Sequence, residues 1–240
     1  MNVQEATTRR LPDLKERHLP ENCRETINTI LKETYGYEQF RNLEIYDDLS
    51  KGKEKLCISQ GQLIENVILE AEKAWKGETQ VDNILLTAPT GSGKSLLFQL
   101  PAIYLGKEYN LLTIVVSPLK ALIVDQVESL QELGYMRVAY ASSDLSPEQK
   151  MEVYRQVREG EIDLFYLSPE LLLSYDIKHF VGERRIGLVV VDEAHTVTTW
   201  GKEFRVDYWF LGRYLNTLKQ TLGYNFPLFA LTATAVWNPK

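Results

Sequence analysis

NILLTAPTGSGKSLLFQLPAIYL, residues 83–105, is the stretch that decides the fold. An apolar run at 84–86 predicts a strand, the segment 88–95 fits the phosphate-binding pattern G/A-x-x-x-x-G-K-S/T, and the apolar spacing after it predicts a helix. Gly91 and Gly93 lack a Cβ, so the backbone can turn tightly and point N–H groups at phosphate oxygens. The stretch therefore predicts an α/β fold with a nucleotide-binding turn.

The side chains of this turn divide the expected work. The Lys94 ammonium reaches the β- and γ-phosphates, the Ser95 hydroxyl ligates Mg²⁺, and the positive end of the following helix adds to the attraction. The alternative is a glycine-rich turn that happens to contain Gly-Lys-Ser. The residues predicted to contact the nucleotide here are Pro89, Thr90, Gly91, Ser92, Gly93, Lys94, Ser95 and Leu96.

Composition sets limits on the partners. The 240 residues are 44% hydrophobic and 25% charged, which is ordinary for a globular protein with a substantial core. Lys and Arg number 27 against 33 Asp and Glu, for a net charge of −6. A protein that binds nucleic acid through bulk charge would be basic, so any such binding must rest on local loops.

The same totals bear on location. Cys23 and Cys57 form no C-x-x-C pair, so neither a disulfide framework nor a zinc site is expected, as suits a reducing cytosol. No apolar run approaches the roughly 18–20 residues that span a bilayer, and the first 20 residues do not resemble a signal peptide. We expect a cytoplasmic protein without a membrane partner.

The chain divides into a polar arm at 1–20, a helical lead-in at 21–78 and an α/β domain at 79–240. A helix opens at Glu21 and is capped by Gly36, and a second runs over 61–76. The segment 42–60 has no clear pattern. Its basic cluster of Lys51, Lys53 and Lys55 is interpreted as a solvated turn.

Strands and helices alternate beyond residue 105. This order predicts a mostly parallel central sheet with helices on both faces. Strands are expected at 111–116, 137–140, 163–167, 187–191 and 229–231, and helices at 119–133, 147–159, from 169, and at 207–222.

Asp192-Glu193-Ala194-His195 follows the apolar strand 187–191. Residues just past the ends of parallel strands face the ligand crevice. Asp192 would hold Mg²⁺, and Glu193 would act as general base on the attacking water. The alternative for these two carboxylates is a charged loop after a core strand. His195 would link the nucleotide site to a neighbouring element, and the alternative for it is a polar cap on that loop. Lys94, Asp192, Glu193 and His195 are thus the predicted catalytic set.

These motifs together resemble the first motor domain of superfamily 2 helicases, most closely the RecQ family. The resemblance implies a RecA-like P-loop NTPase domain with an N-terminal helical extension, and ATP-driven movement on single-stranded DNA with 3′-to-5′ polarity. The matching segments are 31–41, 89–101, 116–119 with 125–127, 167–170, 192–195 and the aromatic-rich loop 198–205 with Tyr208.

The resemblance also implies nucleic-acid contacts. Trp200 and Phe204 offer faces on which bases stack, worth roughly 1–3 kcal/mol each, and Arg205 adds a phosphate or cation–π contact. The alternative is that the aromatic residues pack a helix onto the core. The implied contacts are Ser117, Pro118, Ser168, Pro169, Glu170, Trp200, Phe204 and Arg205.

The base-recognition motif departs from the family pattern. In RecQ-like proteins a glutamine that reads adenine lies a few residues after Phe-Arg, where this chain has Glu44. Gln60 and Gln62 are the candidates, and Gly61-Gln62 at the start of a helix favours Gln62, with Arg41 as a further contact.

The resemblance implies a second, arginine-bearing motor domain beyond Lys240, because such arginines complete the ATP site. We therefore expect these residues alone to bind nucleotide and hydrolyse it slowly. An RNA-directed helicase of the same superfamily is the first alternative, and a non-catalytic nucleotide-dependent binding module is the second.

Overall fold

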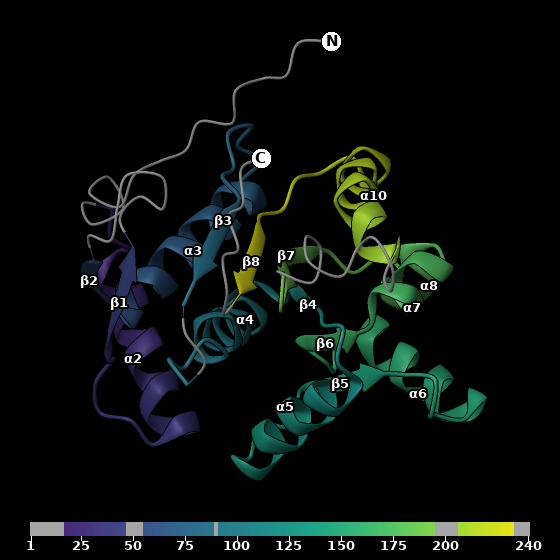
Figure 1. The fold of residues 1–240 in the computed structure, drawn as a ribbon, viewed down its shortest axis with the longest axis horizontal. Helices are drawn as coiled ribbons and strands as arrows, with labels where there is room; N and C mark the ends of the chain where they lie inside the picture. Colours follow the sequence, from purple (N-terminus) through teal and green to yellow (C-terminus); the bar gives the residue numbers. More distant parts are fainter. Residues whose placement is uncertain (1–16, 47–54, 89–90, 195–205, 233–240) are drawn as a thin grey trace.

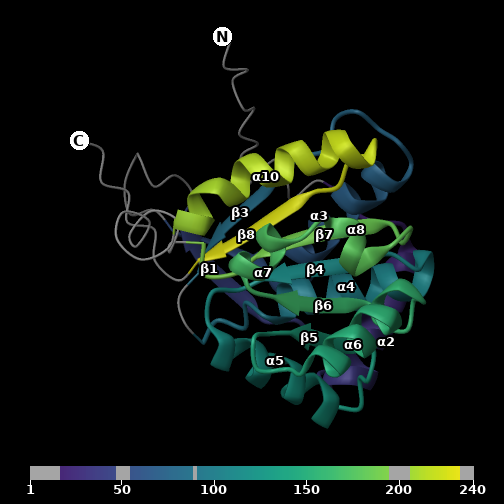
Figure 2. The ribbon, with the colours of Figure 1, turned by 90° about the vertical axis from the view of Figure 1, so that its right-hand side faces the viewer.

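A six-stranded sheet forms the centre of the molecule, and every neighbouring pair of strands is parallel. The computed structural model describes residues 17–46, 55–88, 91–194 and 206–232. Figures 1 and 2 show the sheet from two sides. Its strands, in spatial order, are β3 (Ile84–Thr87), β8 (Leu228–Thr232), β7 (Ile186–Val191), β4 (Leu112–Val116), β6 (Leu164–Leu167) and β5 (Val138–Ala141).

Helices cover both faces, as predicted (Figure 1). Alternate strand residues feed two separate cores: Val115 of β4 joins one, and Ile114 and Val116 join the other. The first core takes α2 (Glu21–Tyr35), α3 (Gln60–Trp75), α4 (Leu96–Tyr109) and α5 (Lys120–Glu132). The second takes α6 (Pro147–Arg158), α7 (Pro169–Ser174), α8 (Ile177–Val181) and α10 (Val206–Leu222).

The two helices of the lead-in begin and end close to where the sequence predicts. Gly36 closes α2 with φ 68°, a conformation that glycine adopts without strain. The Ser59 hydroxyl caps α3 by accepting a hydrogen bond from Gly61 N. Both helices pack their apolar faces against the first core, so the lead-in and the sheet share one hydrophobic interior.

A two-stranded antiparallel sheet lies between these helices, and the sequence analysis did not predict it. β1 (Asn42–Tyr46) pairs with β2 (Lys55–Ser59), and Asn42 stands opposite Ser59. Leu43 is buried while Glu44 is exposed, so only one face of the pair contacts the core. Charged residues between the two strands hide this short alternation, and Lys51 and Lys53 lie outside the described residues.

The short helix α8 was also not predicted. Elsewhere the expected elements appear within about two residues of their predicted bounds. Among the described residues, no helix is both long enough and apolar enough to cross a membrane.

Candidate nucleotide and nucleic-acid site

The phosphate loop joins β3 to α4, as the sequence predicts. Gly91 and Gly93 have φ of 80° and 77°, the left-handed region that glycine enters without a steric penalty. Lys94 Nζ donates to the carbonyl of Ala88, 3.0 Å away, so the ammonium lies against its own loop. Ser95 lies at the amino end of α4, where backbone N–H groups attract anions.

Backbone hydrogen bonds fix which motifs are neighbours. Ala88 N, at the start of the loop, donates to Thr232 O at the end of β8 (3.0 Å). Ala194 N, within the acidic motif, donates to Leu231 O of the same strand (2.8 Å). The phosphate loop and the acidic motif are therefore separated only by the end of β8.

The same edge continues across the sheet. Asp192 N donates to Val116 O (2.9 Å), which ties the acidic motif to the end of β4. Ser117 N in turn donates to Leu167 O at the end of β6 (3.1 Å). All the described motifs after β3 thus meet at the carboxyl edge of one parallel sheet, where such folds bind ligands.

The acidic pair is held in a defined geometry. Asp192 is 7% exposed, and its Oδ1 accepts a hydrogen bond from Glu193 N at 2.9 Å. Glu193 has φ 49°, which is unusual for a residue with a side chain. Such backbone conformations persist where surrounding structure enforces them, and they cluster at functional sites.

Gln60 contacts the described part of the phosphate loop. Its Nε2 donates to Ser92 O (3.2 Å) and its Oε1 accepts from Arg41 N (3.1 Å), with the side chain 3% exposed. A Cβ on Gly93 would meet Gln60 Nε2 at 2.7 Å, so the glutamine closes one side of the loop. The choice of Gln62 over Gln60 as the residue that reads adenine stays a prediction, since the contact of Gln60 is with the backbone of the loop.

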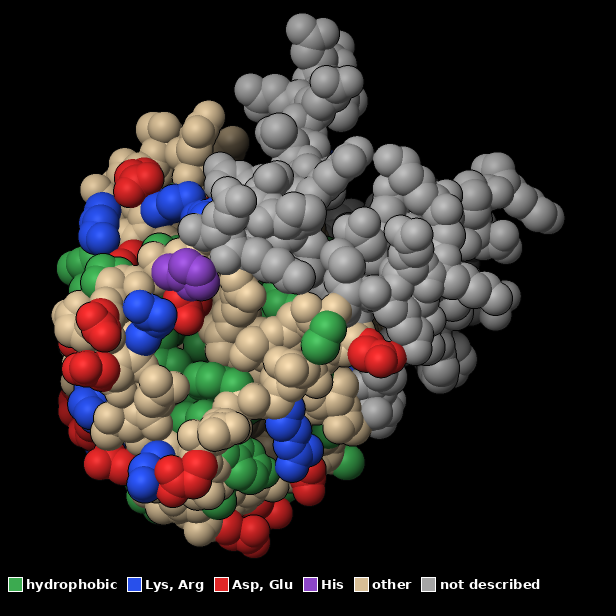
Figure 3. Space-filling view, turned by 90° about the vertical axis from the view of Figure 1, so that its left-hand side faces the viewer, with side chains coloured by type: hydrophobic (Ala, Val, Ile, Leu, Met, Phe, Trp, Pro, Cys, Tyr) green, Lys and Arg blue, Asp and Glu red, His purple; other side chains and the backbone are tan. Residues whose placement is uncertain are grey.

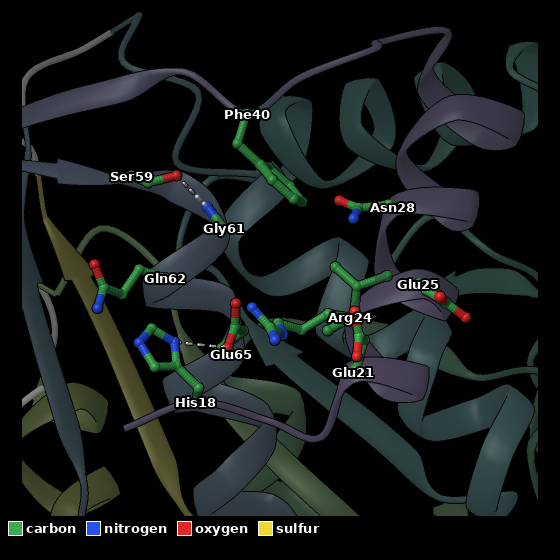
Figure 4. A pocket seen from close by; sticks show the side chains of 11 residues that line it. His18, Glu21, Arg24, Glu25, Asn28, Phe40, Ser59, Gly61, Gln62 and Glu65 are labelled. Carbon is green, nitrogen blue, oxygen red and sulfur yellow. Dashed lines mark hydrogen bonds and ion pairs between the residues drawn. The ribbon is translucent and has the colours of Figure 1, made fainter. Parts of the chain in front are cut away.

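Gln62 lines a different space, a hollow of about 430 Å³ between α2 and α3. In Figure 4, Phe40 enters from above while Asn28 projects from α2. His18 Nδ1 lies 3.4 Å from Glu65 Oε2 at the other end. Figure 3 shows acidic and basic side chains interspersed over the described part of this face.

Tyr37 and Arg41, in the segment that resembles the base-recognition motif, form a flat cationic surface. The Arg41 guanidinium lies 5.7 Å from the centre of the Tyr37 ring, and Tyr37 is 47% exposed. Tyr35 stacks behind Tyr37 with ring centres 6.4 Å apart. A cation over an exposed aromatic ring is a suitable surface for a planar base.

The comparison with protein families decides the identity. The family described as DEAD/DEAH box helicase matches residues 63–240. The chain belongs to this helicase family. The matched range contains the phosphate loop, the acidic motif and all six strands of the central sheet.

Among the curated relatives that this chain matches are DNA helicases named RecQ and RecS. The RecQ DNA helicase of Haemophilus influenzae is 31% identical over 210 residues, and that of Synechocystis is 34% identical over 217. Each match covers 88% of this chain. The probable DNA helicase RecS of Bacillus subtilis is 40% identical over 147 residues, which is 61% of this chain. The chain spans only 28%, 38% and 27% of these relatives' lengths, respectively.

Solved helicase structures share the fold and confirm the RecA-like prediction. The helicase MrfA bound to DNA and AMPPNP superposes with a TM-score of 0.59 at 22% identity, covering 93% of this chain and 28% of that one. A hypothetical RNA helicase from Sulfolobus tokodaii gives 0.55 at 18% identity, covering 90% and 51%.

The described nucleic-acid candidates of this helicase domain lie at the same sheet edge with different exposure. Ser117 is 1% exposed, and its Oγ has no hydrogen-bond partner among the described residues. The Ser168 hydroxyl caps α7 by accepting a hydrogen bond from Leu171 N. Glu170, in the first turn of the same helix, is exposed. Pro169 is buried, so its contribution is to start the helix.

Several predicted residues lie outside the described part of the chain. They are Pro89, Thr90, His195, Trp200, Phe204 and Arg205, together with Thr198, Thr199, Gly201, Lys202 and Glu203 of the aromatic-rich loop. Their roles stay predictions. Leu96 is described, and with 8% exposure it anchors α4 in the core.

The donor atoms present suit a magnesium nucleotide. Within the described ranges, no group of three or more His, Cys, Asp or Glu could hold a metal ion alone. Mg²⁺ needs no such cage, because it keeps several waters and uses one or two protein oxygens with substrate phosphates. Ser95 and Asp192 supply such oxygens at one edge. Ser92 Oγ is buried without a hydrogen-bond partner in the described structure, as fits a loop shaped for a polar ligand.

Proposed function

We propose that this chain is the first motor domain of an ATP-dependent DNA helicase that moves 3′ to 5′ on single-stranded DNA. The observation that carries the proposal is the hydrogen-bonded order of motifs along one sheet edge. Along this edge the phosphate loop is followed by the end of β8, the acidic motif, and the two segments expected to contact DNA, which begin at Ser117 and Ser168. ATP binding at one end of this edge can therefore act on nucleic acid held along it.

Each side chain of the edge has a distinct role in the proposal. Lys94 binds the β- and γ-phosphates, and Ser95 and Asp192 hold Mg²⁺, which neutralises phosphate charge. Glu193 accepts the proton of the attacking water, and the hydrogen bond between its N–H and Asp192 keeps the two carboxyl groups in register.

The base would lie beside the loop. Tyr37 and Arg41 offer the stacking surface, and Gln62 with Phe40 lines the neighbouring hollow. Gln60 holds the phosphate loop instead, through Ser92. This division assigns base recognition to Gln62 and loop geometry to Gln60.

DNA would cross the same edge. Ser117, Pro118, Ser168 and Glu170 lie at the ends of β4 and β6, and Trp200, Phe204 and Arg205 would add stacking and phosphate contacts. The relatives' names specify DNA, which favours DNA over RNA. A second motor domain would supply the arginines that speed hydrolysis.

Nucleotide binding is the first test. A fluorescent non-hydrolysable ATP analogue should bind this chain, and Lys94→Ala should weaken binding at least about tenfold by removing phosphate contacts. Lys107→Ala, exposed on the same helix, is the matched control and should leave affinity unchanged. Equal affinity in both variants would contradict the assignment of the loop.

The nucleic acid is tested separately. Single-stranded DNA should stimulate ATP hydrolysis by the full-length protein more strongly than single-stranded RNA of the same sequence. Stronger stimulation by RNA would overturn the choice of DNA and leave the ATP site intact.

A further inference from the structure

A chain of hydrogen bonds leads away from the phosphate loop into the interior. Gln126 Nε2, on α5, donates to Ser95 Oγ over 2.8 Å. Gln99 Nε2, on α4, donates to Gln126 Oε1 over 2.8 Å. Two amides on different helices thus stand behind the hydroxyl that is expected to ligate magnesium.

The chain continues to two tyrosines. The Tyr35 hydroxyl, at the end of α2, donates to Gln99 Oε1 over 3.3 Å. Gln99 Nε2 also lies 3.3 Å from the Tyr166 hydroxyl of β6. Gln99 is 6% exposed and Tyr166 is 1% exposed, so water does not compete freely for these bonds. We call Tyr35, Gln99, Gln126 and Ser95 the relay.

The relay has one direction. A phenol hydroxyl can donate one hydrogen bond, and Tyr35 donates it to Gln99 Oε1. Gln99 must then present its NH₂ to Gln126 Oε1, and Gln126 must present its NH₂ to Ser95. Burial raises the pKa of both Tyr35 and Tyr166, so both stay protonated at neutral pH. The negative charge of Asp192 raises the pKa of Tyr166 further, which couples this tyrosine to the acidic motif.

The consequence falls on the Ser95 hydroxyl. Because it accepts a hydrogen bond from Gln126 on one lone pair, its own hydrogen is directed elsewhere and the second lone pair stays available. A metal ligand whose orientation is set in advance loses less freedom on binding.

We propose that Gln126 and Gln99 are positioning residues that orient Ser95 for magnesium. The relay also joins this ligand to α5, which follows the strand-contact motif at 117–119, and to the end of α2, which leads into the base-contact segment. Metal occupancy at Ser95 is thereby coupled to both elements. This inference rests on the proposed magnesium-nucleotide site.

The test compares nucleotide affinity with and without the metal. Binding of a fluorescent non-hydrolysable ATP analogue is measured in Mg²⁺ and in EDTA, and the ratio of the two dissociation constants is the readout. Gln126→Leu should reduce the magnesium-dependent gain about tenfold, the loss typical for a partner of a metal ligand, while affinity in EDTA is unchanged. Gln131→Leu, farther along α5 and outside the relay, is the matched control.

Gln99→Leu separates a relay from a local contact. The Gln99 side chain bonds to Gln126, and only the Gln99 backbone, which the substitution keeps, bonds to Ser95. The substitution should nevertheless cause a similar loss, and the double variant should lose little more than either single one. Tyr35→Phe keeps the ring and removes only the donor, so it tests the relay with the least risk to folding. It should lower the same ratio.

The possible results separate a failure of the relay from a failure of the magnesium-nucleotide site. If the wild type gains affinity with Mg²⁺ but Gln126→Leu behaves like Gln131→Leu, the relay is wrong and the nucleotide site stands. Additive losses in the double variant would also overturn the relay. If the wild type binds no nucleotide, or binds it equally well in EDTA, the proposed magnesium site itself fails.

Discussion

Glu193 combines an uncommon backbone conformation with a fixed neighbour. Its φ of 49° turns the chain directly after β7, and its N–H is bonded to Asp192 Oδ1. The sequence predicts both carboxylates from their place after an apolar strand. It cannot show the positive φ, which depends on the Ala194 and Asp192 backbone bonds to β8 and β4.

Glu193→Gln keeps the size of the side chain and removes the base. We expect ATP-analogue affinity to stay close to wild type while ATP hydrolysis falls by about 10²–10⁴, the usual contribution of a general base. Glu183→Gln, exposed at the opposite edge of the sheet, should leave both quantities unchanged. Unaltered turnover in Glu193→Gln would favour the non-catalytic binding module.

Substitutions of Gln60 and Gln62 should have different effects on stability and nucleotide binding. Gln60→Leu leaves Ser92 O and Arg41 N without their partner, so the free energy of unfolding should drop by about 1–3 kcal/mol and every nucleotide should bind less tightly. Gln62→Leu should lower the preference for ATP over GTP. Urea denaturation and competition binding measure the two effects; a loss of base preference in Gln60→Leu alone would reverse the assignment.

Elements with a long apolar signal were predictable, and short ones were not. Val189 and Val190 identify β7 because they lie in a run buried on both faces. The Ser146–Gln149 capping box confirms the predicted start of α6. The strands of the β1–β2 pair expose one face and are separated by charged residues, and α8 has five residues, which is little more than one helical turn.

Glu70 of α3 joins the lead-in to the segments before and after it. Its carboxylate accepts from Arg17 (2.6 Å), Lys73 (3.0 Å) and Asp82 N (2.8 Å). Burial alone would raise the pKa of Glu70, but the hydrogen bonds from Asp82, Arg17 and Lys73 outweigh it and the pKa is lowered below 4.5. Deprotonated Glu70 therefore stabilises the folded state above about pH 4.5, and this stabilisation is lost as pH falls through the lowered value.

The corresponding measurement is urea denaturation between about pH 6 and pH 3. The wild type should lose stability towards the acid end, and Glu70→Gln should be less stable at pH 6 with a shallower dependence on pH. Glu108→Gln, exposed on α4, should keep the wild-type slope. Identical slopes in wild type and Glu70→Gln would contradict this role.

The amino edge of the sheet has its own anchor. Asp163, just before β6, is 1% exposed and accepts from Arg137 Nε (2.7 Å), Arg184 Nη2 (3.0 Å) and the Tyr135 hydroxyl (2.8 Å). Since all six strands are parallel, this cluster lies at the edge opposite the nucleotide site. It is a structural counterpart to the functional edge.

Asp163→Ala should cost about 3–5 kcal/mol, because it leaves the buried guanidinium of Arg184 without its carboxylate partner. Glu38→Ala breaks the exposed ion pair with Lys32 and should cost less than about 1 kcal/mol. Urea denaturation at neutral pH compares them. Similar small losses in both variants would show that the buried cluster does not stabilise the sheet.

One sheet with a hydrophobic core on each face organises the whole molecule. The proposed nucleotide site lies at its carboxyl edge, and the Asp163 cluster lies at its amino edge. The family match covers residues 63–240, which includes the whole sheet and most of α3. With a net charge of −6, the proposed DNA binding would depend on local groups at the carboxyl edge of the sheet. In the proposed function, ATP-dependent changes at that edge would drive movement on DNA, and the proposed relay would extend those changes into α5 and α2.

The most direct test of this account is a crystal structure of the chain with Mg²⁺ and AMPPNP. We expect Lys94 at the β- and γ-phosphates, the Ser95 hydroxyl and the Asp192 carboxylate at or one water away from the metal, and Glu193 facing the γ-phosphate. A nucleotide bound away from the phosphate loop, or a metal remote from Asp192, would contradict it.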